Sequence, residues 1–318
     1  MDIKVSILVP VYKAEKYIEE CLCSLFEQTY DNIEYIFVND ATPDKSMNIV
    51  MRTISKYPNR SNSVIIIDNK TNLGVAETRN ILLDKATGDY IYFVDSDDFI
   101  ALDTITTLVD IAQEKKADIV RCNFNNYIDN KSILNTRKPL KKGTDYLRDC
   151  LANETGMNAL WLLLIRRALI IDQKLSFPKG INGCEDLLMT IKLFYYANVI
   201  IDTPRALYYY RVDNNTSVTH NEAIFRNDFC KAVIEIKSFL IEKDLYNRYI
   251  YEIQNLMFIS KQKFLLNKEI RDIDKYVNTF PESNDFYKAY DYSLKEKILF
   301  YLASHHYITI LKFLCKYL

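Results

Sequence analysis

The chain has 318 residues, of which 49% are hydrophobic and 26% are charged, and its formal net charge at pH 7 is −1. This length accommodates one large α/β domain and a smaller appendage. No basic stripe dominates the sequence, which argues against nucleic acid as a partner. The first apolar run begins directly after Lys4, leaving no room for a signal peptide, and the seven cysteines include no CxxC pair. We therefore expect a cytoplasmic protein with reduced thiols.

Apolar, β-branched runs alternate with helical patterns over the first 122 residues. Runs that are apolar on both faces fit the buried strands of a largely parallel sheet. Five runs have this character: 5–11, 35–38, 64–67, 90–94 and 118–122. Between them, residues 18–26 and 75–86 repeat apolar side chains at helical spacing. The alternation predicts an α/β fold.

Three carboxylates crowd into four positions after the fourth run: Asp95, Asp97 and Asp98. On its own this segment has two interpretations. It is either a polar turn in which Asp98 caps a helix expected from Ala101, or a metal site in which Asp95 and Asp97 offer oxygen ligands to Mn²⁺ or Mg²⁺. Carboxylates this close repel one another unless a cation lies between them.

Acidic residues also follow other predicted strands. Asp40, with Asp44 nearby, follows the second run, and Asp68 follows the third. In open sheets of this class, ligands bind outside the carboxyl ends of the strands, where one cleft would collect these side chains. Neither a GxGxxG nor a P-loop motif occurs in the chain, so any phosphate must be held by a metal and by side chains.

Five sequence motifs occur in the order in which family 2 glycosyltransferases carry them. They are Val9–Leu22, Gln28–Tyr30, Val38–Asp44, Asn72–Asn80 and Phe93–Asp98. Over about residues 3–220 the chain therefore resembles this family, which has the GT-A fold, a Rossmann-like, mostly parallel sheet flanked by helices. The resemblance implies transfer of a sugar from a nucleotide-diphosphate donor with inversion at the anomeric carbon.

The resemblance also implies a nucleoside pocket. It places Pro10, Val11, Tyr12 and Asp40 around the nucleoside, where the Asp40 carboxylate would favour a uracil base and hence a UDP-sugar. Without the family pattern, Asp40 is equally a helix N-cap before Pro43.

Contacts to the rest of the donor follow from the same pattern. Asp95 and Ser96 are expected near the ribose or sugar, and Asp97 on a Mn²⁺ or Mg²⁺ ion. Arg211, with Ser217, resembles a segment that closes over the diphosphate. The alternative for Arg211 is a surface arginine at a strand edge.

The family pattern places Arg79 near the nucleotide phosphates or the acidic cluster. Its alternative is an ion pair on the helix surface with Glu77 or Asp84. The two interpretations differ in burial, because a surface pair leaves the guanidinium in water.

A base is needed because a sugar hydroxyl becomes a good nucleophile only as its proton is removed. Glu185 and Asp186 follow a loop rich in helix breakers, 177–184, and open the helical pattern 187–197. Acids at a helix start also complement the helix dipole, but the resemblance places the base here. Asp186 is assigned as base and Glu185 as an acceptor-positioning or structural residue, with the reverse open. His220 is a loop residue or a phosphate or metal contact.

The expected function is metal-dependent, inverting transfer from a UDP-sugar to a carbohydrate or lipid-linked saccharide acceptor, in bacterial-type cell-surface polysaccharide or glycolipid synthesis. Acceptor identity stays open, because Leu163 stands where the resemblance calls for lysine. The alternatives are a catalytically silent nucleotide-sugar-binding scaffold and a phosphotransferase with a nucleophilic aspartate. The latter fits poorly, since Phe99 stands where such enzymes need Thr or Val.

We expect a catalytic domain at 1–220, made of a nucleotide-sugar half at 1–122 and an acceptor-side half at 123–220, followed by a helical extension at 221–318. The last stretch, 295–318, mixes lysines with aromatic and aliphatic residues. It either lies on the inner face of a membrane as a peripheral contact, or packs onto the catalytic domain or a homodimer partner.

Overall fold

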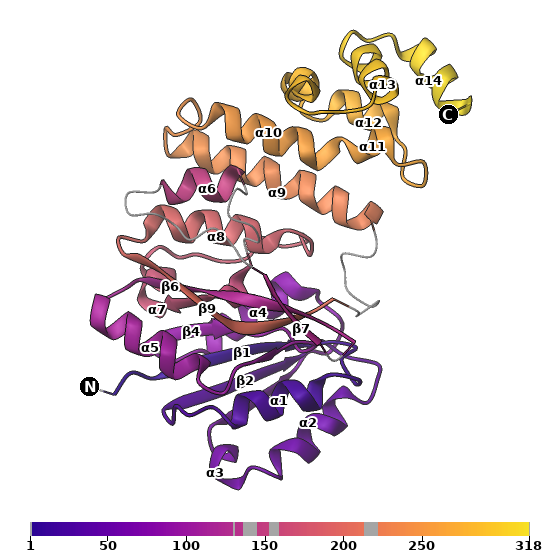
Figure 1. The fold of residues 1–318 in the computed structure, drawn as a ribbon. Coiled ribbons are helices and arrows are strands. Elements are labelled where there is room, and N and C mark those ends of the chain that lie inside the picture. The colour runs from indigo at the N-terminus through magenta and orange to yellow at the C-terminus, as the bar shows by residue number, and fades with distance from the viewer. Residues whose placement is uncertain (1, 130, 136–144, 153–158, 213–221, 318) are drawn as a thin grey trace.

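The computed structural model describes residues 2–129, 131–135, 145–152, 159–212 and 222–317. One half of the molecule is a twisted sheet with helices on both sides, and the other half is a stack of helices (Figure 1). The N-terminus lies beside the sheet and the C-terminus at the far end of the helical stack.

The first part of the chain alternates strands and helices, as the apolar runs predict. Its elements are β1 (Val5–Val11), α1 (Ile18–Phe26), β2 (Ile33–Asn39), α2 (Ser46–Ile54), α3 (Pro58–Ser61), β3 (Val64–Asp68), α4 (Val75–Lys85), β4 (Tyr90–Phe93), β5 (Phe99–Ile100) and α5 (Thr104–Lys115). Six of the seven residues of β1 and six of the seven of β2 are buried, which requires apolar side chains on both faces. The α/β class is confirmed.

The second part completes the sheet. Its elements are β6 (Ile119–Ile128), β7 (Lys131–Asn135), α6 (Tyr146–Ala152), η1 (Leu160–Leu162), β8 (Leu163–Arg166), α7 (Arg167–Asp172), α8 (Glu185–Tyr196) and β9 (Ile200–Arg211). The strand order is β3-β2-β1-β4-β8-β6-β9-β5, with β7 beside β6. The strands β3, β2, β1 and β4 are parallel, whereas β8 is antiparallel to both of its neighbours. The expected parallel character therefore holds on the predicted donor side, and the sheet is mixed beyond β4.

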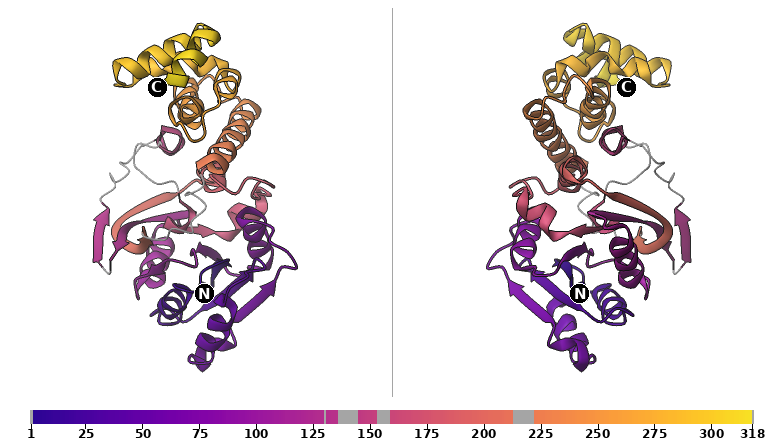
Figure 2. Two further views of the ribbon diagram at one scale, coloured as in Figure 1. Left: turned by 90° about the vertical axis from the view of Figure 1, so that its right-hand side faces the viewer. Right: turned by 90° about the vertical axis from the view of Figure 1, so that its left-hand side faces the viewer.

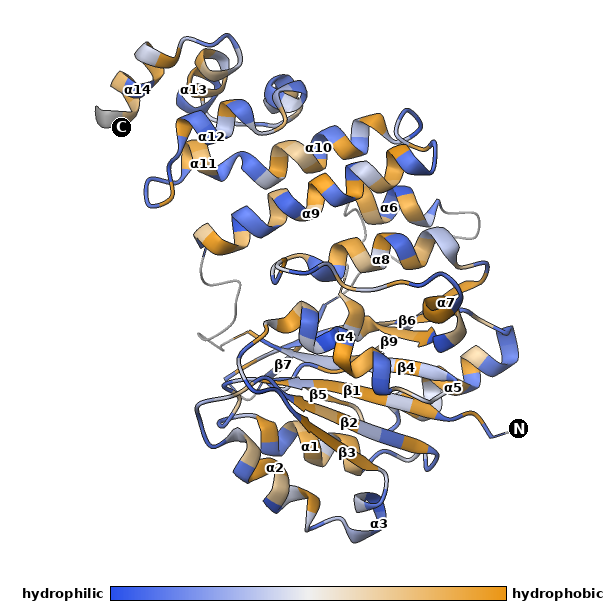
Figure 3. Ribbon diagram, turned by 180° about the vertical axis from the view of Figure 1, so that it is seen from behind, coloured by the Kyte–Doolittle hydropathy of each residue, from blue (hydrophilic) through white to orange (hydrophobic). Residues whose placement is uncertain are grey.

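Helices cover both faces of the parallel part. Helix α4 packs against β1 and β2, on the opposite side of the sheet from α1 and α2 (Figure 3). Helix α8 lies beyond α4 and forms the first layer of the helical stack. Contacts described below bring the start of α4 and the start of α8 together.

Asp98 does not cap a helix. The helix expected from Ala101 begins at Thr104, with Asp103 at its N-cap, and Asp98 instead precedes β5. The Asp98 side chain is 2% exposed, turned into the protein by partners on a distant strand that are described below. The capping interpretation of Asp98 is therefore wrong.

The helical stack is built from α9 (Glu222–Glu242), α10 (Ile250–Lys261), α11 (Lys263–Leu266), α12 (Ile273–Asn278), η3 (Pro281–Ala289), α13 (Leu294–Ser304) and α14 (Ile308–Tyr317). Helix α9 packs against α8 and α10, and α10 packs against α6. Figure 2 shows the stack continuing away from the sheet toward the C-terminus.

The terminal helix α14 packs against α13, at the end of the molecule remote from the sheet (Figure 2). The expectation that this segment packs onto the catalytic domain is therefore wrong, because six intervening elements of the stack separate it from the sheet. Within the described part of the chain, none of the helices combines the length and the hydropathy needed to cross a bilayer.

Candidate active site

The candidate site lies where the parallel strands end. The register pairs Val11 with Asn39 and Asn39 with Asp68, so β1, β2 and β3 finish level with one another. Asp40 follows β2 directly, and Asp95 follows β4 after one residue. The chain thereby delivers the predicted acidic residues to one edge of the sheet.

The turn that carries the metal candidate, Asp95–Asp98, is held from β9. The buried Tyr208 hydroxyl donates to Asp98 Oδ2 at 2.8 Å and accepts from the Asp95 backbone N–H at 3.1 Å. The backbone N–H of Arg211 donates to Asp98 Oδ1 at 2.7 Å. Both oxygens of Asp98 are thus used to fasten the turn to the sheet.

The Arg211 side chain also binds this turn. Its Nε donates to the Asp97 carbonyl at 2.9 Å, and its guanidinium forms an ion pair with Glu20. The guanidinium carbon lies 4.6 Å from the centre of the Tyr17 ring and 4.9 Å from that of Tyr127. Arg211 is only 8% exposed, so the interpretation of a surface arginine is wrong.

Arg79 joins the two halves of the site. From α4 its guanidinium reaches Asp95 Oδ1 at 3.1 Å and Glu185 Oε1 at 2.5 Å, and it also bonds Asp186 Oδ1. The residue is 3% exposed. The interpretation of a surface ion pair with Glu77 or Asp84 is therefore wrong, and Arg79 lies in the acidic cluster.

Arg79 is the shared partner of three carboxyl groups, those of Asp95, Glu185 and Asp186. Burial raises the pKa of Glu185 well above its usual value, the neighbouring Asp186 raises it further, and Arg79 opposes both effects. Burial likewise raises the pKa of Asp95 to about 6, against the opposing pull of Arg79. Such an environment favours an added cation.

The two carboxylates at the start of α8 differ in access. The Glu185 side chain is 8% exposed and the Asp186 side chain 21% exposed. The helix begins at Glu185, two residues earlier than the periodicity predicts. Of the pair, Asp186 offers the more accessible oxygen to a second molecule.

A glycine allows α4 and the loop before α8 to approach closely. Gly74 has a φ of +86°, and a Cβ there would lie 2.4 Å from the side-chain oxygen of Asn182. That oxygen accepts the Ala76 backbone N–H at 3.3 Å, in the first turn of α4. The contact brings Arg79 and the carboxylates at the start of α8 into one cluster.

Asp40 orders the loop that leads into α4. Its carboxylate accepts from Asn69 Nδ2 at 2.9 Å and from the backbone N–H groups of Leu73 at 2.8 Å and Gly74 at 2.9 Å. It is 3% exposed. Helix α2 begins only at Ser46, so the interpretation of Asp40 as a helix cap is wrong.

The predicted nucleoside contacts differ in what they expose. Val11 is fully buried, Ser96 is 7% exposed, and Tyr12 is 42% exposed. Pro10 is half-buried at the end of β1. Tyr12 therefore provides most of the accessible surface at this point, and Val11 acts through its carbonyl, which accepts the Asp40 backbone N–H at 3.0 Å.

Some predicted residues lie outside the cluster. Asp44 bonds the hydroxyl groups of Thr42 and Ser46, and Asp68 accepts from Asn39 at 2.8 Å. Ser217 and His220 are not among the described residues. Leu163, the departure on the acceptor side, is 1% exposed in the core.

Tyr208, Glu20 and Asn182 contribute to the site without being predicted. Tyr208 stands three residues before Arg211 in the same segment. Its role is invisible in the sequence because its partners, Asp95 and Asp98, are more than 100 residues away.

The carboxylates of this cluster suit a metal ion whose remaining ligands come from the substrate. In the described part of the chain, no group of three or more His, Cys, Asp and Glu side chains forms a metal site. Mg²⁺ and Mn²⁺ are commonly held by one or two carboxylates together with substrate phosphates. The half-buried Asp97, beside Asp95 in a cluster short of positive charge, fits that pattern.

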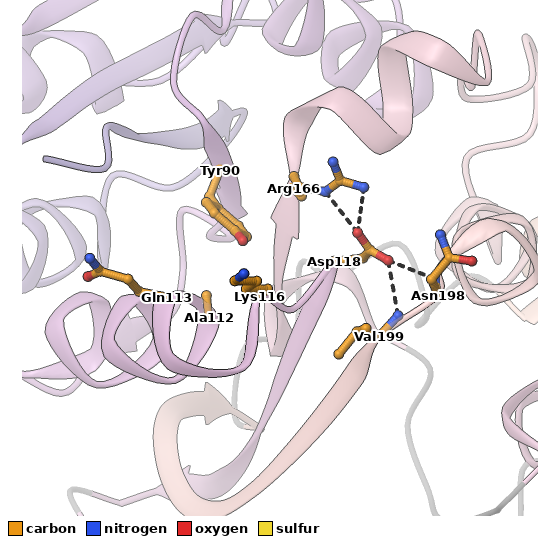
Figure 4. Close-up of a pocket in the computed structure, with 8 residues that line it drawn as sticks. All are labelled: Tyr90, Ala112, Gln113, Lys116, Asp118, Arg166, Asn198 and Val199. Atoms are coloured by element: carbon orange, nitrogen blue, oxygen red, sulfur yellow. Dashed lines mark hydrogen bonds and ion pairs between the residues drawn. The ribbon is translucent and has the colours of Figure 1, made fainter. Parts of the chain in front are cut away.

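A separate hollow of about 470 Å³ lies at the other edge of the sheet (Figure 4). Its acid is satisfied: Asp118 accepts from Arg166 and from the backbone N–H groups of Asn198 and Val199. None of the predicted site residues lines it. This hollow is therefore separate from the candidate site at the carboxyl edge.

Comparison with known proteins identifies the family of this chain. The family model described as "Glycosyl transferase family 2" matches residues 6–172. The chain belongs to this family. The matched segment includes β1 to β8 and with them Asp40, Arg79 and the Asp95–Asp98 turn.

Two curated bacterial relatives of this family member are named only as glycosyltransferases. The "Uncharacterized glycosyltransferase EpsJ" of Bacillus subtilis (strain 168) is 33% identical over 67% of this chain and 62% of its own. The "Uncharacterized glycosyltransferase YibD" of Escherichia coli (strain K12) is 28% identical over 68% of this chain and 63% of its own. The chain thus matches less than two thirds of the length of these relatives.

Solved structures share the GT-A fold of this chain. Staphylococcus aureus TarS 1-349, in a crystal structure with UDP-GlcNAc, has a TM-score of 0.70 at 23% identity, covering 89% of this chain and 81% of that chain. The mannosyltransferase PcManGT from Pyrobaculum calidifontis, in complex with GDP-Man and Mn²⁺, has a TM-score of 0.58 at 19% identity, covering 98% and 81%. The fold expected from the motifs is confirmed.

Proposed function

We propose that this protein transfers a sugar from a UDP-sugar to a hydroxyl acceptor, with inversion at the anomeric carbon. The observation that carries the proposal is the cluster in which Arg79 connects the Asp95–Asp98 turn to Glu185 and Asp186. In this cluster Asp95 lies on the donor side of the Arg79 guanidinium, and Glu185 and Asp186 lie on its acceptor side. A displacement at a sugar carbon needs groups on both sides of that carbon.

On the donor side, Tyr12, with Pro10 and Asp40 at the same strand ends, forms the nucleoside contact. Asp95 and Ser96 face the ribose or sugar, and Asp97 would hold a Mn²⁺ or Mg²⁺ ion. A bound Mn²⁺ or Mg²⁺ supplies positive charge beside the diphosphate, where negative charge grows. The complexes of TarS with UDP-GlcNAc and of PcManGT with GDP-Man and Mn²⁺ support a nucleotide-sugar donor.

Arg211 stabilises the diphosphate side in two ways. It holds the Asp97 carbonyl through Nε, and its guanidinium lies close enough to the turn to meet a phosphate oxygen. In the described structure Glu20 balances its charge. A bound diphosphate would replace Glu20 as the anion that pairs with Arg211, in a bidentate contact.

On the acceptor side, Asp186 is the base. The acceptor oxygen forms its bond to the anomeric carbon as the bond from that carbon to the diphosphate oxygen breaks, and UDP leaves with the electron pair. The acceptor proton passes to the Asp186 carboxylate. Both carboxylates pair with Arg79, but Glu185 is more deeply buried than Asp186, which fits a structural role.

The wider role follows from the named relatives. TarS of Staphylococcus aureus, a poly(ribitol-phosphate) β-N-acetylglucosaminyltransferase, is 25% identical over 90% of this chain and 49% of its own. This supports a carbohydrate or lipid-linked saccharide acceptor and a place in bacterial cell-surface polymer synthesis. We assign catalysis to residues 1–220, and the helical extension to the segment from 221.

A thermal-shift panel of nucleotide sugars with Mn²⁺ tests the donor assignment. A ligand that binds only the folded state stabilises it by about 2.7 kcal/mol at 100 times its Kd. We expect UDP-sugars to raise the melting temperature more than GDP- or CDP-sugars, and Mn²⁺ to strengthen the effect. If no nucleotide sugar shifts the melting temperature with or without metal, the donor assignment is wrong.

A further inference from the structure

The outer face of α13 carries apolar side chains that solvent reaches. Its inner face is formed by Leu299 and Phe300, which are 4% and 0% exposed. On the opposite face, Leu294 is 77% exposed, Ile298 45% and Tyr301 47%. The three follow one another at i, i+4 and i+7, so they form a single stripe along the helix.

Ring contacts continue this stripe to Tyr307, the residue before α14. The rings of Tyr301 and His305 stack with centroids 4.0 Å apart, and those of His305 and Tyr307 are parallel at 6.4 Å. One turn further on, Ile310 is 52% exposed. We call the row formed by Leu294, Ile298, Tyr301, Tyr307 and Ile310 the distal ridge.

Inward contacts fix the direction in which the distal ridge points. Leu311, next to Ile310, is fully buried. Arg271 Nη1 donates to the Cys315 carbonyl at 2.7 Å, which ties α14 to the chain before α12. A capping box between Ser293 and Glu296 fixes the start of α13. The ridge is therefore held outward by a packed structure.

Positive charge accompanies the ridge. From residue 293 to the end, the chain has four lysines and one acid, Glu296, whose carboxylate is used in the capping box. At 100° per residue, Lys295 and Lys297 lie on either side of the stripe on α13. Lys297 and Lys312 pair with exposed aspartates, and exposed pairs of this kind contribute little.

We propose that the distal ridge docks onto the surface of an anionic lipid bilayer. The apolar ridge enters the boundary between headgroups and acyl chains, and the flanking lysines reach the anionic headgroups. A second copy of the chain is a poorer occupant, because two ridges face to face would set lysines against lysines. The ridge lies at the end of the molecule remote from the sheet (Figure 2), so the surface is independent of the proposed catalysis.

Vesicle sedimentation of the full chain tests the proposal. We expect binding to vesicles of phosphatidylcholine with phosphatidylglycerol, little binding to phosphatidylcholine alone, and loss of binding at high salt. The double variant Ile298→Ser/Ile310→Ser should lose at least tenfold in affinity for the anionic vesicles. The matched control Ile241→Ser/Ile250→Ser changes two isoleucines of similar exposure, 56% and 42%, elsewhere in the helical stack, and should bind as wild type does.

A second variant isolates the charge. A lysine near an anionic membrane surface is worth about fivefold in affinity, so Lys295→Gln/Lys297→Gln should weaken binding about 25-fold without changing the melting temperature. Equal affinity for neutral and anionic vesicles would overturn the proposal, as would no binding to either. Analytical ultracentrifugation showing a dimer that Ile298→Ser/Ile310→Ser dissociates, with no vesicle binding, would make the ridge an interface between copies instead.

Discussion

The two edges of the sheet hold buried carboxylates in opposite electrostatic states. At the amino edge, burial acts to raise the pKa of Glu34, but hydrogen bonds from Lys4, Ser6 and Thr87 outweigh it and lower the pKa to about 2. At the carboxyl edge, burial raises the pKa of Glu185 well above its usual value, and Arg79 offsets this only in part.

The difference separates an acid that stabilises the fold from acids poised to bind. Each oxygen of Glu34 has donors within 3.1 Å, so its charge is met inside the protein. The carboxyl-edge acids instead share one arginine in a partly open cluster, where the Asp186 side chain is 21% exposed. Perturbed carboxylates of the second kind concentrate at functional sites.

The largest effect is expected at the proposed base. Asp186→Asn keeps the shape of the side chain but cannot accept the acceptor proton, so transfer should fall by about 10²- to 10⁴-fold. UDP affinity should stay within a few-fold of wild type, measured by calorimetry. An active Asp186→Asn variant would move the role to Glu185.

Removing the shared cation should destabilise the carboxyl edge. Arg79→Met leaves Asp95, Glu185 and Asp186 without their partner, and breaking a buried ion pair costs about 3–5 kcal/mol. Urea denaturation measures the free energy of unfolding. The control Arg52→Met removes an exposed arginine that pairs with Glu19. A loss no larger than in the control would contradict the account of the cluster.

At the amino edge, Glu34→Gln should cost about 2 kcal/mol at pH 7, after allowance for the partly exposed Lys4 partner. The folded pKa lies below the unfolded value of about 4.3, so the stabilisation is present above that value and is lost as pH falls toward 2. The variant should therefore show a smaller loss of stability than wild type between pH 5 and 2. Glu114→Gln, on the exposed surface of α5, is the control, and an unchanged acid profile in Glu34→Gln would refute the contrast.

An effect of similar size to that of Glu34→Gln is expected where Tyr208 holds the Asp95–Asp98 turn. Tyr208→Phe removes the partner of Asp98 Oδ2 and of the Asp95 N–H, which should cost about 1–3 kcal/mol. The Mn²⁺ concentration that gives half of the maximal increase in UDP affinity should rise several-fold, because the turn is held less firmly. Tyr209→Phe, whose ring stacks on Phe99 4.5 Å away, should leave it unchanged. Equal behaviour of the two variants would remove the positioning role of Tyr208.

The sequence predicts the strands and places the acidic residues at the carboxyl edge of the sheet, because buried strands appear in a sequence as long apolar runs. It fails where side chains fold back across the sheet. Asp98 looks like a local helix cap, yet its oxygens bind Tyr208 and Arg211 on β9. No local pattern announces a partner more than 100 residues away.

Breaks in the helical stack were hidden for another reason. The backbone is left-handed at Asp244, Phe280 and His306, with φ values of 55°, 49° and 58°. Asp244 and His306 interrupt stretches whose sequence has a continuous helical pattern, and Phe280 lies between two such stretches. Glycine usually marks such positions, and none occurs after Gly183. The pattern therefore predicts helices but not where they turn.

Calorimetric titration of UDP into wild type and Asp97→Asn, each with and without Mn²⁺, tests the central claim most directly. That claim is that the carboxyl-edge acids form a metal-assisted donor site. It predicts that Mn²⁺ strengthens UDP binding to wild type and has no such effect on Asp97→Asn, while the control Asp68→Asn behaves as wild type. Binding that is equally strong without metal, or unchanged in Asp97→Asn, would contradict it.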